Sequence, residues 1–140
     1  MTELKSELLY EMQVQLAEAQ EIGNTPHGRR RIIYVKGGTF EGPRLKGEVL
    51  PGGGDWFLSR PDNVGELDIR ATMRTDDGHL IYASYRGLLH GGDAGSGLYF
   101  RTTPYYETTA EKYGWLNRIV AVGVGRPIEG GIAYEVYAIL

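Results

Sequence analysis

The sequence predicts an all-β protein that closes into one antiparallel barrel, and three observations support this fold. The chain has 21 glycines and 10 tyrosines among 140 residues, spread between short β-branched and aromatic runs, a composition typical of strands joined by turns. Several segments alternate apolar with polar residues, as strands with one buried face do. Closing the sheet removes the exposed edges that many short antiparallel strands would leave. We expect roughly eight or nine strands in a single domain, with a two-sheet sandwich as the alternative.

The strands are predicted from runs of alternating or β-forming residues between turn signals. Along residues 8–16, Tyr10, Met12, Val14 and Leu16 share one face. The predicted strands cover residues 8–16, 30–36, 45–50, 56–59, 66–75, 79–88, 99–103, 116–123 and 132–140. The apolar faces of the first and the last strand make these two the expected partners. Residues 108–113 are expected to form a helical turn, and the glycine-rich loop 90–97 is expected to be mobile.

Two glycine-rich segments, at residues 37–43 and 51–54, are predicted to be turns. Each places glycines and a proline beside an aromatic ring and a carboxylate, and the second leads directly into Asp55 and Trp56. Glycine allows a close approach of the backbone and tolerates positive φ. A tryptophan beside an aspartate offers an apolar wall with a charge at its edge, a common arrangement in small-molecule pockets. These segments therefore predict the mouth of a pocket.

A series of short motifs resembles one protein family. In order they are Gly37-Gly38-Thr39-Phe40-Glu41-Gly42-Pro43, Pro51-Gly52-Gly53-Gly54-Asp55-Trp56, Thr75-Asp76-Asp77-Gly78, Tyr99-Phe100-Arg101-Thr102, Glu107-Thr108 and Tyr113-Gly114-Trp115-Leu116-Asn117. They resemble the bacterial and fungal family catalogued as domain of unknown function 3237, from about Tyr10 to the C-terminus. The resemblance implies a calycin-like antiparallel barrel with no established cofactor and an activity that is undefined for most members.

Composition argues against several functional classes. The 15 basic and 18 acidic residues give a net charge of −3, and the run Arg29-Arg30-Arg31 is interpreted as a charged strand edge, so no nucleic-acid partner is expected. No apolar stretch reaches membrane-spanning length and the first residues carry charges, so we expect a cytoplasmic protein without a membrane partner. The three histidines lack metal-ligand spacing, and the glycines of residues 91–97 lack the lysine of a phosphate-binding loop. We therefore expect neither a metal nor a cofactor.

Asp55, Tyr82 and Asn117 are the predicted catalytic residues. The neighbouring indole would desolvate the Asp55 carboxyl and raise its pKa into a range useful for proton transfer. Alternatively, Asp55 caps its own glycine turn. Tyr82 and Asn117 would stabilise an oxyanion. Trp115 and Asn117 are expected to share one strand face; their structural alternative is a packed tryptophan and an asparagine that fixes a loop.

The predicted substrate-binding residues are Trp56, Arg70, Arg101 and Trp115. Arg101 could bind a carboxylate or merely pair with Glu107. Asp68 and Arg70 share one strand face, which points either into the barrel or outward. A two-residue turn at Asp77-Gly78 would place Arg86 beside apolar residues of the preceding strand. A bulged three-residue turn would place it opposite Asp68 as an ion pair.

The sequence thus predicts a barrel that binds a carbonyl-bearing or aromatic metabolite in an apolar cavity ringed by these seven residues. The bound metabolite is then expected to undergo cofactor-independent acid/base chemistry, as in an isomerase, cyclase or lyase, with Asp55 moving the proton. The alternatives are a carrier or sensor without catalysis, and an oligomeric scaffold. A homo-oligomer is expected, with Tyr10, Met12 and Val14, or Tyr134 and Val136, as a self-complementary patch.

Overall fold

The computed structural model describes residues 1–92 and 97–140, so part of the loop predicted to be mobile, residues 93–96, lies outside the described residues. Ten strands and one 3-10 helix follow one another along this part of the chain. They are β1 (Ser6–Leu16), β2 (Gln20–Thr25), β3 (Gly28–Glu41), β4 (Lys46–Val49), β5 (Gly54–Ser59), β6 (Gly65–Thr75), β7 (Leu80–His90), β8 (Tyr99–Glu107), η1 (Glu111–Arg118), β9 (Val120–Ile128) and β10 (Gly131–Ile139).

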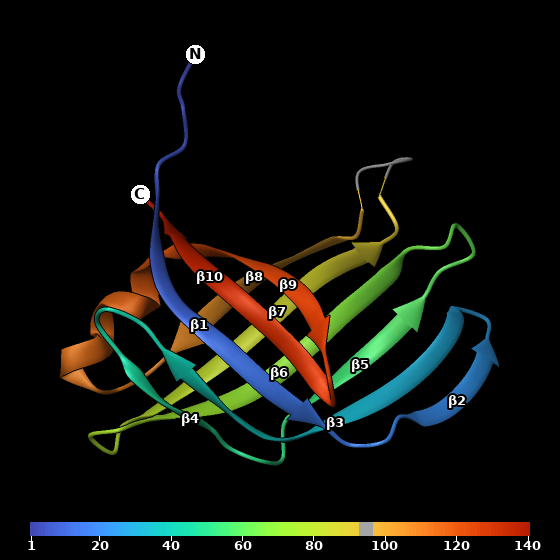
Figure 1. Cartoon of the computed structure of the whole chain (residues 1–140), viewed down its shortest axis with the longest axis horizontal. Coiled ribbons are helices and arrows are strands. Elements are labelled where there is room, and N and C mark those ends of the chain that lie inside the picture. The colour runs from blue at the N-terminus through green and yellow to red at the C-terminus, as the bar shows by residue number, and fades with distance from the viewer. Residues whose placement is uncertain (93–96) are drawn as a thin grey trace.

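The sheet closes on itself as an antiparallel barrel (Figure 1). Its order is β1-β10-β9-β8-β7-β6, followed by β4 and β5, which both lie between β6 and β3, and the pairing of β1 with β3 completes the ring. The two short strands share one position, so the barrel has eight positions, and β2 extends β3 as a hairpin outside the ring. The predicted barrel is confirmed, as is the pairing of the first strand with the last, from Ser6 opposite Ile139 to Gln15 opposite Gly131.

Strand alternation points one face of each strand into the barrel. On β1 the inward residues Tyr10, Met12 and Val14 are only 2–4% exposed, and Tyr134 and Val136 of β10 are equally buried. These are the residues that the sequence suggested as a self-association patch, so that patch was wrong: their apolar face is the barrel core. A homo-oligomer stays a prediction without an assigned surface.

Most of the first glycine-rich segment is strand: β3 runs through residues 37–41, where the predicted turn was wrong, and Gly42 and Pro43 belong to the connection to β4. The register of β3 against β1 shifts between Gln15 opposite Gly37 and Leu16 opposite Val35, which marks a bulge. Gly37 has a φ of 147°, and a Cβ on Gly38 would lie 2.1 Å from the carbonyl oxygen of Gln13. Glycine is therefore needed at Gly38, where β1 and β3 close the ring. The second segment does turn, at residues 51 and 52.

The β6–β7 hairpin adopts the second of the two predicted registers. The amide of Thr75 donates to the carbonyl of His79, and Asp68 lies opposite Arg86. In β6 the odd-numbered residues are buried and the even-numbered ones, including Asp68 and Arg70, point outward. The described residues contain no ion pair between Asp68 and Arg86, although the two side chains are cross-strand neighbours.

The helix η1 closes one end of the barrel. Its Tyr113 and Leu116 are 2% and 1% exposed, and the Tyr113 hydroxyl donates to Asp77 in the β6–β7 turn, 2.9 Å away. The sequence predicted a shorter helical turn and a strand from residue 116, but η1 continues to Arg118 and β9 begins at Val120. No helix in the described ranges is long and apolar enough to cross a membrane.

Candidate functional site

A cavity of about 170 Å³ lies inside the barrel. Its lining includes the last residues of β1 and β7, and both strands end away from η1 (Figure 1). Its walls come from seven strands and are mainly apolar. The lining residues are Val14, Leu16, Arg31, Ile33, Val35, Asp55, Phe57, Leu67, Ile69, Tyr85, Leu89, Phe100, Ile132 and Tyr134. Leu16, Leu89 and Ile132, at the ends of their strands, are only partly buried and form the rim. An eight-stranded barrel has room inside for one small ligand, and this cavity fits that description.

Among the residues that the structure describes, Asp55 is the one carboxyl group that lines this cavity. It lies on β5 opposite Ile33 of β3 and Ile69 of β6, and Phe57 follows it on the inward face. Its Oδ1 accepts a hydrogen bond from the backbone amide of Asp68 at 3.0 Å. Burial raises the pKa of Asp55 to about 6, and that hydrogen bond limits the rise. At neutral pH the carboxyl group can therefore both accept and release a proton.

Two tyrosines, Tyr85 of β7 and Tyr134 of β10, line the cavity together with Asp55. Their rings meet edge to face with centroids 5.8 Å apart, and both side chains are buried. Burial raises the pKa of each phenol, so both remain neutral hydrogen-bond donors at neutral pH. Deeper in the barrel, the hydroxyl oxygens of Tyr10 and Tyr106 are hydrogen-bonded at 2.6 Å.

Arg31 of β3 also lines the cavity. Its guanidinium carbon lies 5.3 Å from the centre of the Phe57 ring, and its Nη1 is 3.8 Å from Glu21 Oε2. The sequence analysis treated the three consecutive arginines as a charged edge. Arg29 and Arg30 fit that interpretation, because Arg29 pairs with Glu21 at 3.3 Å and Arg30 donates to the carbonyl of Trp56 at 2.7 Å. Arg31 departs from it, since strand alternation turns this residue inward.

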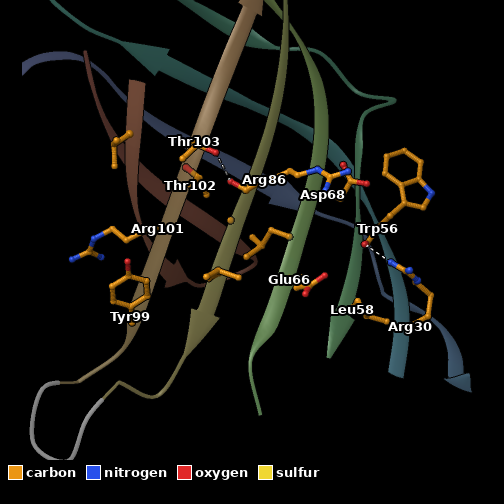
Figure 2. Close-up of a pocket in the computed structure, with 14 residues that line it drawn as sticks. Arg30, Trp56, Leu58, Glu66, Asp68, Arg86, Tyr99, Arg101, Thr102 and Thr103 are labelled. Carbon is orange, nitrogen blue, oxygen red and sulfur yellow. Dashed lines mark hydrogen bonds between the residues drawn. The ribbon is translucent and has the colours of Figure 1, made fainter. Parts of the chain in front are cut away.

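A second, larger hollow of about 880 Å³ lies on the outer face of β5, β6, β7 and β8 (Figure 2). We call it the outer groove. Figure 2 shows Trp56 and Arg30 at one side, and Tyr99 and Arg101 at the other. Leu67 lines both the outer groove and the cavity, because the β5–β6 ladder is interrupted between Asp55 opposite Ile69 and Leu58 opposite Glu66.

The residues predicted to ring one cavity do not converge, and that prediction was wrong. Trp56 follows Asp55 on a strand, so when Asp55 points inward Trp56 points outward, into the outer groove with Arg101. Arg70 also lies outside, with its guanidinium carbon 5.6 Å from the Trp56 ring. Tyr82 is on the outer face of β7 and 37% exposed.

Trp115 and Asn117 do not share a strand face, because both belong to η1. The side chain of Asn117 accepts from the amide of Thr108 at 2.9 Å and donates to its carbonyl at 3.0 Å, which is the loop-fixing alternative. Trp115 packs under the guanidinium of Arg44, whose central carbon is 3.7 Å from the ring centre. Of the seven predicted site residues, Asp55 alone lines the interior cavity.

Sequence reasoning missed Arg31, Tyr85 and Tyr134 as site residues. Tyr134 was assigned to a self-association patch, and no motif drew attention to Tyr85. Strand alternation could have pointed to them, because all three occupy inward positions of their strands. Arg31 lies on β3, which pairs directly with the strand of Asp55, whereas Tyr85 and Tyr134 lie on strands that do not pair with it. Finding them required the strand order and the phase of β3, which the bulge at Gly37 changes.

Comparison with known proteins now places the chain in a family. The family model described as "Protein of unknown function (DUF3237)" matches residues 4–139. The chain belongs to the DUF3237 family. The resemblance found in the sequence motifs is thereby confirmed. A curated relative, a UPF0311 protein of Clostridium acetobutylicum, is 32% identical over 124 residues that cover 80% of this chain and 78% of the relative.

Crystal structures of similar proteins share the DUF3237 barrel. A β-barrel-like protein of Acinetobacter baumannii superposes with a TM-score of 0.94 at 34% sequence identity. The superposition covers 100% of this chain and 98% of the Acinetobacter chain. A conserved protein of unknown function from Rhodopseudomonas palustris also gives 0.94, at 28% identity, with both chains fully covered at 100%. An enzyme from Penicillium herquei gives 0.83 at 21% identity, covering 100% of this chain and 97% of its own, a likeness of fold alone.

Proposed function

We propose that this DUF3237 protein binds a small ring-bearing molecule in its interior cavity and moves a proton on it through Asp55. The observation that carries the proposal is the Asp55 carboxyl group in an apolar cavity, with a pKa raised to about 6 by burial. A carboxyl group with a pKa near the working pH suits general acid/base catalysis. One solved structure of the same fold, from Penicillium herquei, is described as an enzyme.

The size of the cavity limits the ligand. A dry apolar cavity of about 150 Å³ is known to hold one benzene molecule. The present cavity, at about 170 Å³, has room for one ring with a small substituent. A larger metabolite could place such a ring inside and extend the rest of its structure past the rim formed by Leu16, Leu89 and Ile132.

The cavity residues support enolisation of a carbonyl compound. The Asp55 carboxylate would take a proton from the carbon next to the carbonyl group; the electron pair of that C–H bond would form a C=C bond to the carbonyl carbon, and the π electrons of the C=O bond would move onto the oxygen. Tyr85 and Tyr134 are neutral phenols beside the same cavity and can donate hydrogen bonds to the developing oxyanion. Return of the proton to a different atom completes an isomerisation, and neither step needs a cofactor.

A carrier or sensor is the second candidate, and the closure of the barrel favours it. Tyr113 and Leu116 of η1 are buried at the other end of the barrel, so a bound molecule would leave past the rim. A carrier would retain its ligand unchanged, whereas the enzyme proposed here would exchange a proton of the ligand with solvent. Because an isomerisation leaves the mass of the ligand unchanged, the purified protein is incubated in deuterium oxide and the released ligand is weighed by mass spectrometry: uptake of carbon-bound deuterium indicates the enzyme, and an unlabelled ligand indicates a carrier.

Two tryptophan substitutions on one strand test the location of the site. Leu89 lines the cavity and the preceding residue, Leu88, lines the outer groove. We expect Leu89→Trp to fill the cavity mouth and weaken the binding of phenol at least tenfold, since a ring can no longer enter. The matched variant Leu88→Trp should bind phenol like the wild type. Chemical-shift titration by NMR measures both affinities.

The opposite pattern would overturn the proposal. Loss of phenol binding in Leu88→Trp, with normal binding in Leu89→Trp, would move the ligand site to the outer groove. Circular dichroism and thermal unfolding of both variants check that the barrel remains intact, so that a failure to fold is not mistaken for a blocked site.

A further inference from the structure

The side chain of Arg31 has an unusual environment at the cavity. Its Nε is shielded from water and finds no hydrogen-bond partner among the described residues, and it is the one buried side-chain nitrogen or oxygen there in that situation. Buried polar groups in native proteins nearly always have a partner, and exceptions often mark a functional site. The side chain as a whole is 37% exposed, so the guanidinium retains freedom to turn toward the cavity mouth.

Arg31 and Asp55 face the same cavity without pairing. Arg31 lies opposite Phe57 and Asp55 lies opposite Ile33, so the two charged residues occupy diagonal positions on β3 and β5. Such diagonal neighbours are typically about 7–8 Å apart, a separation that a side chain as long as arginine can span, so the absence of a pair reflects where the two side chains point. The ion pairs of the described residues include Arg31 with Glu21, at 3.8 Å, and none between Arg31 and Asp55. A bound molecule can fill this separation.

We propose that Arg31 anchors an oxygen anion of the ligand, so that the molecule bound in the cavity is a ring compound carrying a carboxylate. This proposal rests on the proposed function, because it assigns a chemical class to the ligand of the same cavity. The ring occupies the apolar part lined by Leu67, Phe100 and Tyr134, and the carboxylate accepts a hydrogen bond from the Arg31 guanidinium at the mouth. Arginine suits this contact because its planar fork of donors matches a carboxylate.

The charged groups near Arg31 have other partners, so its guanidinium can bind an anion of the ligand. Glu21 lies on the solvent side and is shared with Arg29, which is closer to it, at 3.3 Å against 3.8 Å. Arg30 is on the outer face and donates to the Trp56 carbonyl. Among the described residues, Asp55 is the other charged group that lines the cavity, and its Oδ1 already accepts a hydrogen bond from the Asp68 amide. Arg31 is thus the cation positioned to meet an anion inside the rim.

Benzoate and toluene provide a matched pair of probes, since both carry one ring and they differ in the carboxylate. Arg31→Met keeps much of the side-chain length and removes the charge. We expect it to weaken benzoate binding about ten- to a hundredfold, the usual effect of losing a charged hydrogen bond, and to leave toluene binding unchanged. The control Arg29→Met removes the neighbouring arginine, which also pairs with Glu21 and is 58% exposed. Calorimetric titration at a pH just below 6 limits repulsion from Asp55.

Each outcome bears on one of the two proposals. Selective loss of benzoate binding in Arg31→Met supports the anchor. Equal losses of benzoate affinity in Arg31→Met and Arg29→Met would show an effect of general surface charge and would overturn the anchor proposal. Unchanged benzoate binding in Arg31→Met, or wild-type binding of toluene without benzoate, would also overturn it while leaving the cavity proposal standing. Failure of the wild type to bind toluene would contradict the proposed function itself.

Discussion

Asp55 holds an ionisable group in an apolar interior, and this has a cost in folding free energy. Its pKa is about 6 in the folded protein and near 3.8 in an unfolded chain. Between these values the folded state binds more protons than the unfolded state, so stability falls as pH rises through this window and the penalty is complete above pH 6. The full penalty is at most about 3 kcal/mol, and partial exposure of the side chain reduces it to about 1–2 kcal/mol.

The variant Asp55→Asn tests this penalty. Asparagine cannot ionise, but its side-chain oxygen can still accept from the Asp68 amide. We expect the variant to be more stable than the wild type by about 1–2 kcal/mol well above pH 6 and to lose this advantage near pH 4. Urea unfolding at both pH values measures the difference. A stability difference that does not change with pH would show that Asp55 is not strained by ionisation.

At the scale of elements, the contact between β1 and β3 closes the barrel and depends on Gly38. A Cβ at this position would meet the Gln13 carbonyl oxygen at 2.1 Å and the Val14 Cα at 2.9 Å, both in the backbone of β1. Because neither atom is the end of a flexible side chain, the two strands must separate to admit a methyl group.

We therefore expect Gly38→Ala to destabilise the protein by about 2–3 kcal/mol, as overpacking of a tight contact does. Gly114→Ala is the matched control, because nothing lies within 4 Å of a Cβ added there and its backbone is helical. Alanine should be neutral or slightly stabilising at that site. Chemical denaturation compares the two variants, and equal stabilities would contradict the role assigned to the closing contact.

The same contact shows which part of the strand arrangement could be predicted. Alternation along residues 8–16 and 66–75 is strong, and the inward residues of β1 and β6 follow from it. The glycines at 37 and 38 gave a turn signal, yet they form a bulge inside β3. A glycine pair allows either arrangement, and the decision depends on the pairing of β3 with a strand distant in sequence. The predicted helical turn was too short for a similar reason. The 3-10 helix is held by its contact with the β6–β7 turn, which is distant in sequence.

At the scale of the whole molecule, the barrel was predictable and most of the site was not. Asp55 and Trp56 are adjacent, and adjacent residues of a strand face opposite sides of the barrel wall, so they could not line one cavity. Tyr82, Arg70 and Arg101 were predicted to ring the cavity, with an outward face left open for Arg70, and all three lie outside because the sequence does not fix which face of each strand is buried. Tyr85 and Tyr134 come from strands far apart in sequence, and only ring closure brings them to Asp55.

The central claim is that Asp55 moves a proton on a molecule held inside the barrel. Phenylacetone, a small ketone that carries a phenyl ring, serves as the probe of this proton transfer. In deuterium oxide its hydrogens next to the carbonyl group exchange when a base removes them, and NMR follows the loss of their signal. We predict exchange catalysed by the wild type, slowed at least about a hundredfold in Asp55→Asn and by a similar factor in Leu89→Trp. Exchange in Asp55→Asn at the wild-type rate would contradict the claim.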